Sequence, residues 1–276
     1  MTRLIRPKIA GRTLSGPKIA WARTLGGSTA AKFKRAVEGT QVARVWRRAK
    51  WIVVDLERAG ASAGHLLIHL RMTGRLVVAA EAVPYDRVSI QLDGGPERLV
   101  FSDVRKFGRF QFMADPGPVL DALGPEPLCD EFTADWLYSA LRSRKRALKP
   151  LLLDQTFLAG LGNIYVDEAL HRSRLHPQRG SNQVDKRAAG RLHDAIREVL
   201  EGAIKLEGSS FDTFYRTPEG QPGAYQHQFL VYGRDGQRCH SCSSTIVKMV
   251  VGQRGTHICR RCQPKPRRQS GLPTAT

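Results

Sequence analysis

Four cysteines near the end of the chain restrict its fold more than any other feature. They form the pattern Cys239-x2-Cys242 and Cys259-x2-Cys262, and two tight Cys-x-x-Cys turns supply the four thiolates of a closed tetrahedral Zn²⁺ site. Because four thiolates leave no open coordination position, we predict one structural Zn²⁺ and no catalytic metal here. The alternative is a pair of disulfides, which intracellular chains rarely keep. The isolated Cys129 is predicted to be a buried thiol rather than a nucleophile.

The chain is strongly basic. Its 276 residues carry a formal net charge of +19, and the sequence pI is about 10.4. Such a surplus favours a polyanionic partner, because Lys and Arg neutralise phosphates and release condensed counterions. An anionic membrane surface is the alternative, but no apolar run reaches the roughly 18 residues of a spanning helix, and the opening segment lacks the apolar stretch of a secretory signal. We expect a cytoplasmic, nucleoid-associated protein with no membrane partner.

Residues 1–115 are predicted to form an antiparallel β-sandwich or barrel. Short β-prone runs alternate there with Gly, Asp and Pro turn signals, and no helical segments separate them. The runs are 51–56, 65–72, 75–80, 87–92 and 97–104. Residues 116–130 are rich in Pro and Gly and are predicted to be a linker.

Apolar residues recur every three or four positions in the second half, which predicts a helical domain. The helical segments are 136–154, 163–175 and 184–206. In the last of them an apolar stripe runs from Val184 through Leu192 and Ile196 to Ile204. Residues 208–230 carry Gly, Ser and Pro and are predicted to be a long loop, which is either functional or disordered. The expected order is a helical domain at 131–230, a zinc finger at 231–263 and a disordered tail at 264–276.

A Gly-rich turn before the second helical segment has the features of a phosphate site. Gly160 and Gly162 permit a close approach of the backbone, and Asn163 is predicted to be a helix N-cap. A helix start with unpaired N–H groups binds phosphate readily. Most such turns only join two helices, so this turn alone leaves both readings open.

Seven segments of the chain resemble, in the same order, the family of formamidopyrimidine-DNA glycosylase and endonuclease VIII, with closer similarity to the former. They are RRAKW (47–51), HLRMTGRL (69–76), DVRKFGRF (103–110), GPEPL (124–128), LKPLLLDQ (148–155), GLGNIYVDEAL (160–170) and VYGRDGQRC (231–239). The resemblance implies an α+β fold with an N-terminal antiparallel β-sandwich and a C-terminal helical domain, which contains a helix–two-turn–helix element and a four-cysteine zinc-finger hairpin. It also implies that DNA lies in the cleft between the domains.

The resemblance further implies an activity in base-excision repair. A member of this family is a DNA glycosylase and AP lyase that removes oxidised purines, such as 8-oxoguanine and formamidopyrimidines, and nicks the strand by β,δ-elimination. The damaged base has to leave the stack before it is attacked, and side chains fill the space that it leaves. The expected partner is damaged double-stranded DNA, bound by a monomer.

Three residues match the family's void-filling side chains: Met72, Arg105 and Phe107. A flexible thioether, a guanidinium that can bond the orphaned base and a flat ring that wedges between bases suit this task. The alternatives are core packing for Met72 and Phe107 and a surface ion pair for Arg105.

Other residues match family contacts around the lesion. Lys50 matches a lysine that faces the lesion and assists elimination, and a solvated charge run is the alternative. Asn163 and Arg254 match the contacts to the flanking phosphates, and Arg254 is also linked to δ-elimination. Lys145 is a weaker match, because two neighbouring arginines compete for the same role. Glu168 matches an acidic family position, and a helix-surface charge is the alternative.

The N-terminus departs from the family pattern. A mature family member begins Pro-Glu-Leu-Pro-Glu-Val-Glu, whose proline amine attacks C1′ and whose glutamate donates a proton, whereas this sequence begins Met1-Thr2-Arg3. We expect either a start assigned to an internal methionine or a shortened, catalytically inactive paralogue that binds damaged DNA, and we favour the first. The 276-residue product itself is predicted to lack glycosylase activity.

Overall fold

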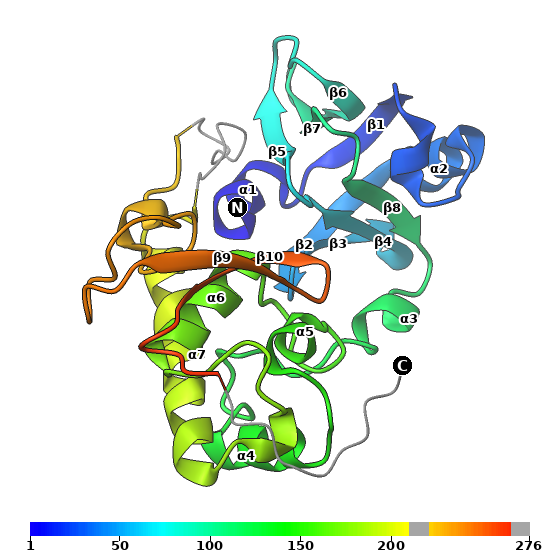
Figure 1. The fold of residues 1–276 in the computed structure, drawn as a ribbon. Helices are drawn as coiled ribbons and strands as arrows, with labels where there is room; N and C mark the ends of the chain where they lie inside the picture. Colours follow the sequence, from blue (N-terminus) through cyan, green and yellow to red (C-terminus); the bar gives the residue numbers. More distant parts are fainter. Residues whose placement is uncertain (210–220, 266–276) are drawn as a thin grey trace. The chain divides into compact units, whose positions relative to one another are not determined.

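A computed structural model describes residues 1–209 and 221–265 of the chain (Figure 1). The chain forms two compact units. Unit 1 is Met1–Ala122 with Leu206–Gln226, and unit 2 is Leu123–Lys205 with His227–Thr276. Residues 210–220 of the loop predicted at 208–230, and most of the tail predicted at 264–276, lie outside the described residues. The domain boundaries expected from the sequence stay predictions.

Unit 1 is built on one antiparallel sheet of eight strands in the order β5-β7-β6-β1-β2-β3-β4-β8. The strands are β1 (Thr13–Ile19), β2 (Thr40–Arg48), β3 (Trp51–Arg58), β4 (Ala61–His69), β5 (Gly74–Ala79), β6 (Asp86–Leu92), β7 (Arg98–Asp103) and β8 (Arg109–Met113). The helices are α1 (Thr2–Ile9), the 3-10 helix η1 (Ala22–Leu25), α2 (Ala30–Val37) and α3 (Gly117–Leu120). All five strands that the sequence predicts are present, as β3 to β7.

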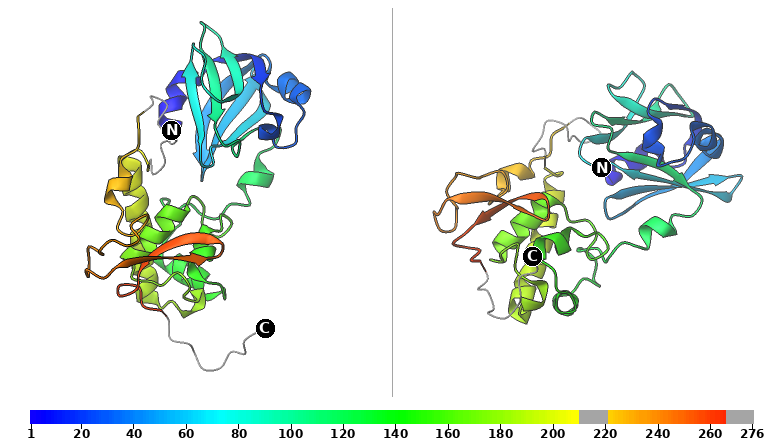
Figure 2. Two further views of the ribbon diagram at one scale, coloured as in Figure 1. Left: turned by 45° about the horizontal axis from the view of Figure 1, so that its top comes forward. Right: turned by 45° about the vertical axis from the view of Figure 1, so that its right-hand side comes forward.

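The sheet folds over on itself around one apolar core (Figure 2). Phe101 in β7 and Phe110 in β8 lie near opposite ends of the strand order, yet their ring centroids are 5.8 Å apart. Two helices join the halves, since α1 packs on β2 and β5 while α2 packs on β1 and β8. Ile5 and Ile9 of α1 and Phe33 of α2 are fully buried in this core. The predicted antiparallel sandwich is confirmed.

Unit 2 is helical and ends in a two-stranded hairpin. Its elements are α4 (Ala134–Arg142), α5 (Leu148–Leu153), α6 (Asn163–Arg172), the 3-10 helix η2 (Ser181–Gln183), α7 (Lys186–Lys205), β9 (Ile246–Val251) and β10 (Arg254–Cys259). A further 3-10 helix, η3 (Tyr225–Gln228), spans the point in the sequence where unit 1 ends and unit 2 resumes. In the described part of the chain, no helix combines the length and the apolar character required to cross a membrane.

The single helical segment predicted at 136–154 is in fact two helices. Pro150 has no N–H group, and its ring excludes helical backbone four residues earlier. The chain therefore ends α4 at Arg142 and begins α5 at Leu148, so that Pro150 falls in the first turn of α5. The start of α4 is fixed by Thr133, whose hydroxyl accepts a hydrogen bond from the N–H of Trp136 at 3.0 Å.

Helix α7 packs against α4 and α6 through most of the predicted apolar stripe. Val184, Leu192 and Ile196 are buried, as predicted. Ile204 is 64% exposed, so its place in the stripe is wrong. The buried position in the last turn belongs to Ala203, and successive residues of a helix point about 100° apart, which turns Ile204 towards solvent.

Candidate functional site

Three connections of unit 1 lie at one end of its sheet. Trp51, which begins β3, pairs with His69 at the end of β4, and His69 pairs in turn with Arg109 at the start of β8. Gly74 at the start of β5 pairs with Asp103 at the end of β7. The β2–β3, β4–β5 and β7–β8 connections therefore lie together at one end of the strands. We name this end the loop rim (residues 49–50, 70–73 and 104–108). The loop rim carries four predicted site residues: Lys50, Met72, Arg105 and Phe107.

Lys50 stands at the tip of the β2–β3 hairpin. The turn has two residues, of which Ala49 adopts a φ of 50°, and Arg47 Nη1 donates to the Ala49 carbonyl at 2.8 Å. Burial, together with the positive charges of Arg71 and Lys50, lowers the pKa of the neighbouring His69 to about 4. His69 is therefore neutral near pH 7, and its Nδ1 accepts a hydrogen bond from the N–H of Arg71 at 3.0 Å.

Met72, Arg105 and Phe107 project from the loop rim. Met72 is 57% exposed and Phe107 is 49% exposed, so the alternative of core packing is wrong for both. The Arg105 guanidinium lies 4.9 Å from the centroid of the Phe107 ring, and it forms no ion pair with any residue that the structure describes. Exposed apolar side chains gathered at one edge are typical of a binding surface.

Asn163 is the first residue of α6, and Gly162 is the N-cap. The predicted N-cap role of Asn163 is therefore wrong. Its Nδ2 instead donates to the carbonyl of Gly255 at 3.0 Å, because β10 packs on α6. Within residues 1–209 and 221–265, the N-cap residue Gly162 provides no side-chain cap for α6, and a helix start of this kind is a suitable place for an anion.

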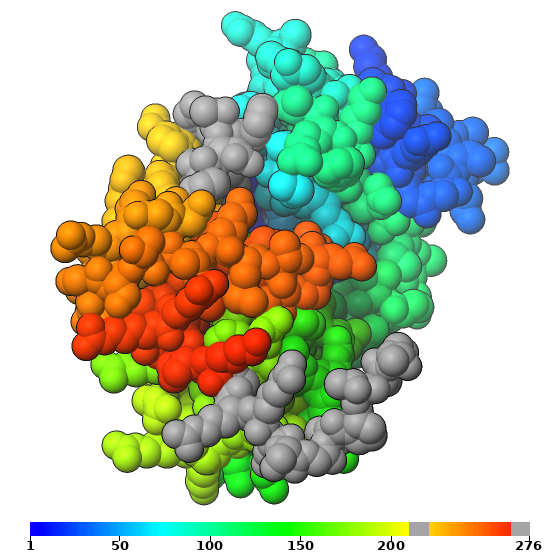
Figure 3. All heavy atoms as spheres, in the orientation of Figure 1, coloured from blue at the N-terminus to red at the C-terminus, as the bar shows by residue number. Residues whose placement is uncertain are grey.

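Arg254 begins β10, directly after the β9–β10 turn, and it is exposed. In the space-filling view the hairpin, coloured orange, lies at the surface of unit 2 (Figure 3). A fully buried ion pair links the hairpin to the helices of unit 2. Lys149 Nζ donates to Asp167 Oδ1 at 2.6 Å and to the Gly255 carbonyl, next to the turn, at 2.9 Å. Asp167 Oδ2 accepts from the N–H of His257 at 2.9 Å. This network fixes the backbone of Arg254 relative to the start of α6.

Lys145 lies between α4 and α5 with an exposed side chain. Its two arginine neighbours already have partners inside unit 2. Arg144 lies over the Phe157 ring at 5.0 Å, and Arg146 Nη1 lies 2.8 Å from Asp154 Oδ2. Lys145 forms no hydrogen bond or ion pair with the described residues, so of these three cations it is the one left available to a phosphate.

Glu168 is not a helix-surface charge. It is fully buried, and its carboxylate accepts hydrogen bonds from three consecutive N–H groups, those of Leu230 (2.8 Å), Val231 (3.0 Å) and Tyr232 (2.9 Å). Burial raises the pKa of Glu168, and the three N–H donors oppose that rise. Glu168 thereby fastens to α6 the segment that leads into the first cysteine pair.

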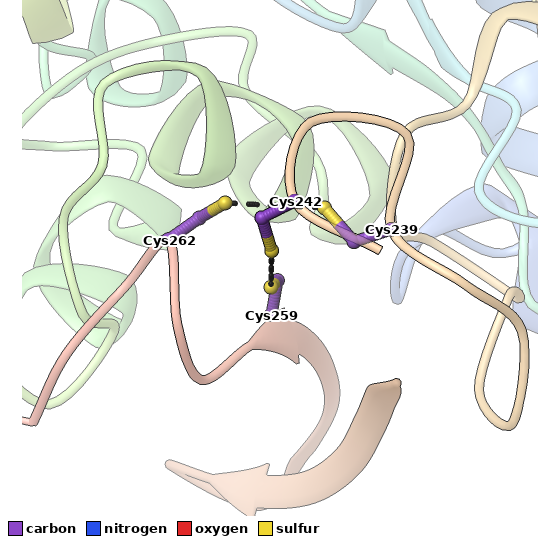
Figure 4. Close-up of side chains that lie close together, drawn as sticks. All are labelled: Cys239, Cys242, Cys259 and Cys262. Carbon is purple, nitrogen blue, oxygen red and sulfur yellow. Dashed lines mark hydrogen bonds between the residues drawn. The ribbon is translucent and has the colours of Figure 1, made fainter. Parts of the chain in front are cut away.

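The sulfur atoms of four cysteines converge beside the β9–β10 hairpin (Figure 4). All four lie within 4.8 Å of one another, with Cys242 Sγ 3.3 Å from Cys259 Sγ and Cys239 Sγ 3.9 Å from Cys262 Sγ. Thiolates at about 2.3 Å from Zn²⁺ stand roughly 3.8 Å apart in a tetrahedron. The cysteines are free rather than disulfide-bonded, and they fit one structural Zn²⁺. The fifth cysteine, Cys129, is exposed, so its predicted burial is wrong.

Models of known families match most of the chain. Residues 1–110 match the formamidopyrimidine-DNA glycosylase N-terminal domain, residues 123–215 match the formamidopyrimidine-DNA glycosylase H2TH domain, and residues 236–265 match the zinc finger found in FPG and IleRS. A formamidopyrimidine-DNA glycosylase of Roseiflexus sp. (strain RS-1) is 42% identical over 260 residues, which are 92% of this chain and 93% of that protein. The chain belongs to the formamidopyrimidine-DNA glycosylase family.

Solved structures of two DNA complexes share the fold of this glycosylase-family chain. One is Lactococcus lactis FPG with a Fapy-dG-containing DNA, at 32% identity and a TM-score of 0.84. The other is Lactococcus lactis Fpg with an abasic-site-containing DNA, at 32% identity and a TM-score of 0.85. Both similarities cover 96% of this chain and 97% of the solved one.

Three residues that support the site were not found from the sequence: Asp103, Lys149 and Asp167. Each is a charged residue within a mainly apolar segment, namely LVFSDV, LKPLLL and NIYVDEAL. Charged side chains are buried only when they are paired or hydrogen-bonded. A single charge in an apolar segment is therefore the signal that could have identified them.

Proposed function

We propose that this chain serves as a DNA glycosylase and AP lyase that removes oxidised purines from duplex DNA in base-excision repair, with the 276-residue product by itself predicted to lack glycosylase activity. The loop rim carries the proposal, because Met72, Arg105 and Phe107 stand exposed on short connections of a sheet with a buried core. A damaged base cannot be attacked inside the stack, so a protein that extrudes it needs side chains to take its place. Membership of the formamidopyrimidine-DNA glycosylase family supports the same reaction class.

The three exposed side chains have separate tasks in the duplex. Phe107 wedges between neighbouring base pairs and kinks the duplex. Arg105 offers guanidinium donors to the base that has lost its partner. Met72 adapts its flexible thioether to the remaining space. The contact of 4.9 Å between the Arg105 guanidinium and the Phe107 ring favours joint insertion of these two groups.

Unit 2 contributes the phosphate contacts. Lys145 and Arg254 are exposed cations, and the uncapped start of α6 offers backbone N–H groups. Asn163 uses one Nδ2 hydrogen for the Gly255 carbonyl, and an amide nitrogen has a second hydrogen for a phosphate oxygen. Such contacts set the position of DNA without reading its sequence.

Lys50 and Arg254 serve the elimination step. Cleavage on the 3′ side of an abasic sugar removes a proton from C2′ and expels the 3′ phosphate. Lys50 supplies an amine at the loop rim that can carry this proton, provided that it lies within hydrogen-bond reach of the sugar. Arg254 holds a departing phosphate as an ion pair, which stabilises the charge that develops on it.

The partner in this proposal is damaged double-stranded DNA, and the chain acts on it as a monomer in the nucleoid region of the cytoplasm. Zn²⁺ has a structural role only. When bound to Cys239, Cys242, Cys259 and Cys262, it fixes the hairpin that carries Arg254.

Competitive binding tests the proposal. We expect duplexes with 8-oxoguanine or a formamidopyrimidine to bind roughly tenfold tighter than the same undamaged duplex at moderate salt, because one inserted aromatic side chain contributes about 1–3 kcal/mol. Phe107→Ala should remove most of this preference. Ile204→Ala, at an exposed apolar residue of α7, is the matched control and should keep it. Equal affinity of the wild-type chain for both duplexes would contradict the proposal.

Borohydride trapping separates a lyase from a protein that only binds damage. A lyase forms a Schiff base with the abasic sugar, and reduction makes that adduct permanent. A trapped adduct supports the lyase reaction. Lesion-selective binding without an adduct is the expected result for the 276-residue product, whose N-terminal sequence predicts no glycosylase activity, and a trapped adduct would overturn that prediction.

A further inference from the structure

We propose that Asp103 and Thr73 are positioning residues, which hold the Met72 connection and the Arg105–Phe107 connection in one fixed arrangement. The three exposed side chains then enter DNA as a single preformed group. This inference rests on the proposed function, and it extends that function to two buried residues beneath the exposed side chains.

The Asp103 carboxylate forms the centre of a buried hydrogen-bond cluster. Asp103 is fully buried and Thr73 is 4% exposed. Asp103 Oδ1 accepts from the Thr73 hydroxyl and from the N–H of Arg105, the latter at 3.2 Å, while Oδ2 accepts from the N–H of Gly108 at 2.7 Å. The N–H of Arg105 also lies 3.2 Å from Thr73 Oγ1. One carboxylate thus links both ends of the segment 105–108 to the residue that follows Met72.

The backbone of Asp103 is held as firmly as its side chain. Its N–H donates to the Tyr85 carbonyl at 3.1 Å, and its carbonyl accepts from Arg87 Nε at 2.8 Å. Asp103 also ends β7, where it pairs with Gly74. The carboxylate is therefore a fixed point to which the two connections are attached.

Both connections have backbone conformations that require such support. Arg71 has a φ of 55° and Lys106 a φ of 62°, values that residues other than glycine adopt only when their surroundings hold them there. A Cβ at Gly74 would lie 2.4 Å from a backbone oxygen of its own connection, and a Cβ at Gly108 would lie 2.4 Å from the Phe101 ring. The first connection is thus tightly folded on itself at Gly74, and the second is packed against the sheet at Gly108.

The partners of Asp103 favour a positioning role over a contribution to stability alone. In residues 1–209 and 221–265 the partners of the carboxylate are one hydroxyl and backbone N–H groups, with no cationic side chain. A buried carboxylate without a counter-charge is expensive, and apolar residues of similar volume often stabilise a fold equally well. What an apolar residue lacks is the ability to hold two connections through directional hydrogen bonds.

Substitutions at Thr73 in the full chain test the inference without requiring catalysis. Thr73→Val removes the hydroxyl, whereas Thr73→Ser keeps it. The matched control is Thr40→Val, because Thr40 is fully buried in the same unit and its hydroxyl donates to the Val37 carbonyl at 2.8 Å. Binding is measured to a duplex with a tetrahydrofuran abasic analogue and to the intact duplex. A 2-aminopurine placed opposite the analogue reports insertion through its fluorescence.

We expect Thr73→Val to lower the preference for the analogue roughly tenfold and to weaken the fluorescence change, while affinity for the intact duplex stays within about twofold. Thr73→Ser and Thr40→Val should keep the wild-type preference. Asp103→Asn is the second variant, in case Thr73→Val does not fold, and the same loss is expected. A wild-type chain without any preference overturns the proposed function and this inference together. A wild-type preference that survives in both Thr73→Val and Asp103→Asn overturns this inference alone.

Discussion

The two units differ in the side chains that they expose as candidate DNA contacts and in the buried groups that hold those side chains in place. The loop rim of unit 1 exposes apolar and aromatic side chains, held from below by the Asp103 carboxylate. Unit 2 exposes cations and helix N–H groups, held by a buried ion pair and a cluster of thiols. Apolar insertion depends on the state of the base stack, whereas phosphate contacts exist on any DNA. We therefore propose that unit 1 recognises the lesion and that unit 2 supplies general affinity for DNA.

Removal of the metal should have the largest effect. Cys259→Ser takes away one of four thiolates in the cluster, and zinc binding contributes on the order of 10 kcal/mol to the folding of small zinc modules. We expect loss of bound zinc, rapid hydrogen exchange in β9 and β10, and no measurable DNA binding, while β3 of unit 1 stays protected. Cys129→Ser, at the exposed cysteine outside the cluster, is the control and should retain zinc. A Cys259→Ser chain that binds DNA normally would break the division of roles between the units.

The buried ion pair comes next in magnitude. Lys149→Met leaves Asp167 buried without its cation, and breaking such a pair typically destabilises a protein by about 3–5 kcal/mol. Lys186→Met is the matched control, because the Lys186–Asp135 pair is 71% and 74% exposed and such exposed pairs contribute little to stability. Urea denaturation measures both variants. Equal effects would mean that the Lys149–Asp167 pair does not hold the hairpin.

Salt dependence sharpens the comparison directly. Arg254→Ala should weaken binding to damaged and undamaged duplexes alike and reduce the slope of log K against log salt by about 1, because one phosphate contact is lost. Phe107→Ala should leave that slope unchanged and reduce only the preference for damage. The measurement is the affinity of both variants for damaged and undamaged duplexes at several salt concentrations. A change of slope in Phe107→Ala, or a loss confined to damaged DNA in Arg254→Ala, would reverse the assignment.

The smallest expected effect concerns the pH dependence of stability at the loop rim. The pKa of His69 is about 4 in the folded chain, below its ordinary value of 6.5, so the unfolded chain takes up this proton first as pH falls. The free energy of unfolding should therefore decrease between about pH 6.5 and pH 4. His69→Asn keeps an acceptor for the Arg71 N–H and should make this decrease smaller. Denaturation at pH 7 and pH 5 gives the change in the free energy of unfolding for the wild type and for His69→Asn. An equal change in both proteins would exclude His69 as a contributor.

Much of the fold was predictable, because local signals agreed with the tertiary structure. Strands β3 to β7 are short apolar runs between turn residues, and α7 has a clear apolar stripe. Strand β1 was not predicted because it contains Gly16 and Pro17, which usually mark a turn, and the structure places a register shift there. Strand β8 is only five residues long and follows a charged connection.

The site was predictable to a smaller extent. The exposed residues of the loop rim and the four cysteines lie in recognisable sequence segments. The buried residues that position them depend on contacts between residues far apart in the chain. Lys149 meets the Gly255 carbonyl across 106 positions, and Thr73 meets Asp103 across 30. The N-cap prediction for Asn163 was wrong for the same reason, since a strand 92 positions away accepts its hydrogen bond. No local pattern specifies such pairs.

Titration of the wild-type chain with two duplexes, one intact and one with a tetrahydrofuran abasic analogue, tests the central claim most directly. The experiment is run across a range of salt concentrations. We predict that both affinities fall in parallel as salt rises, while a preference of roughly tenfold for the analogue persists throughout. Equal affinities at every salt concentration would contradict the account.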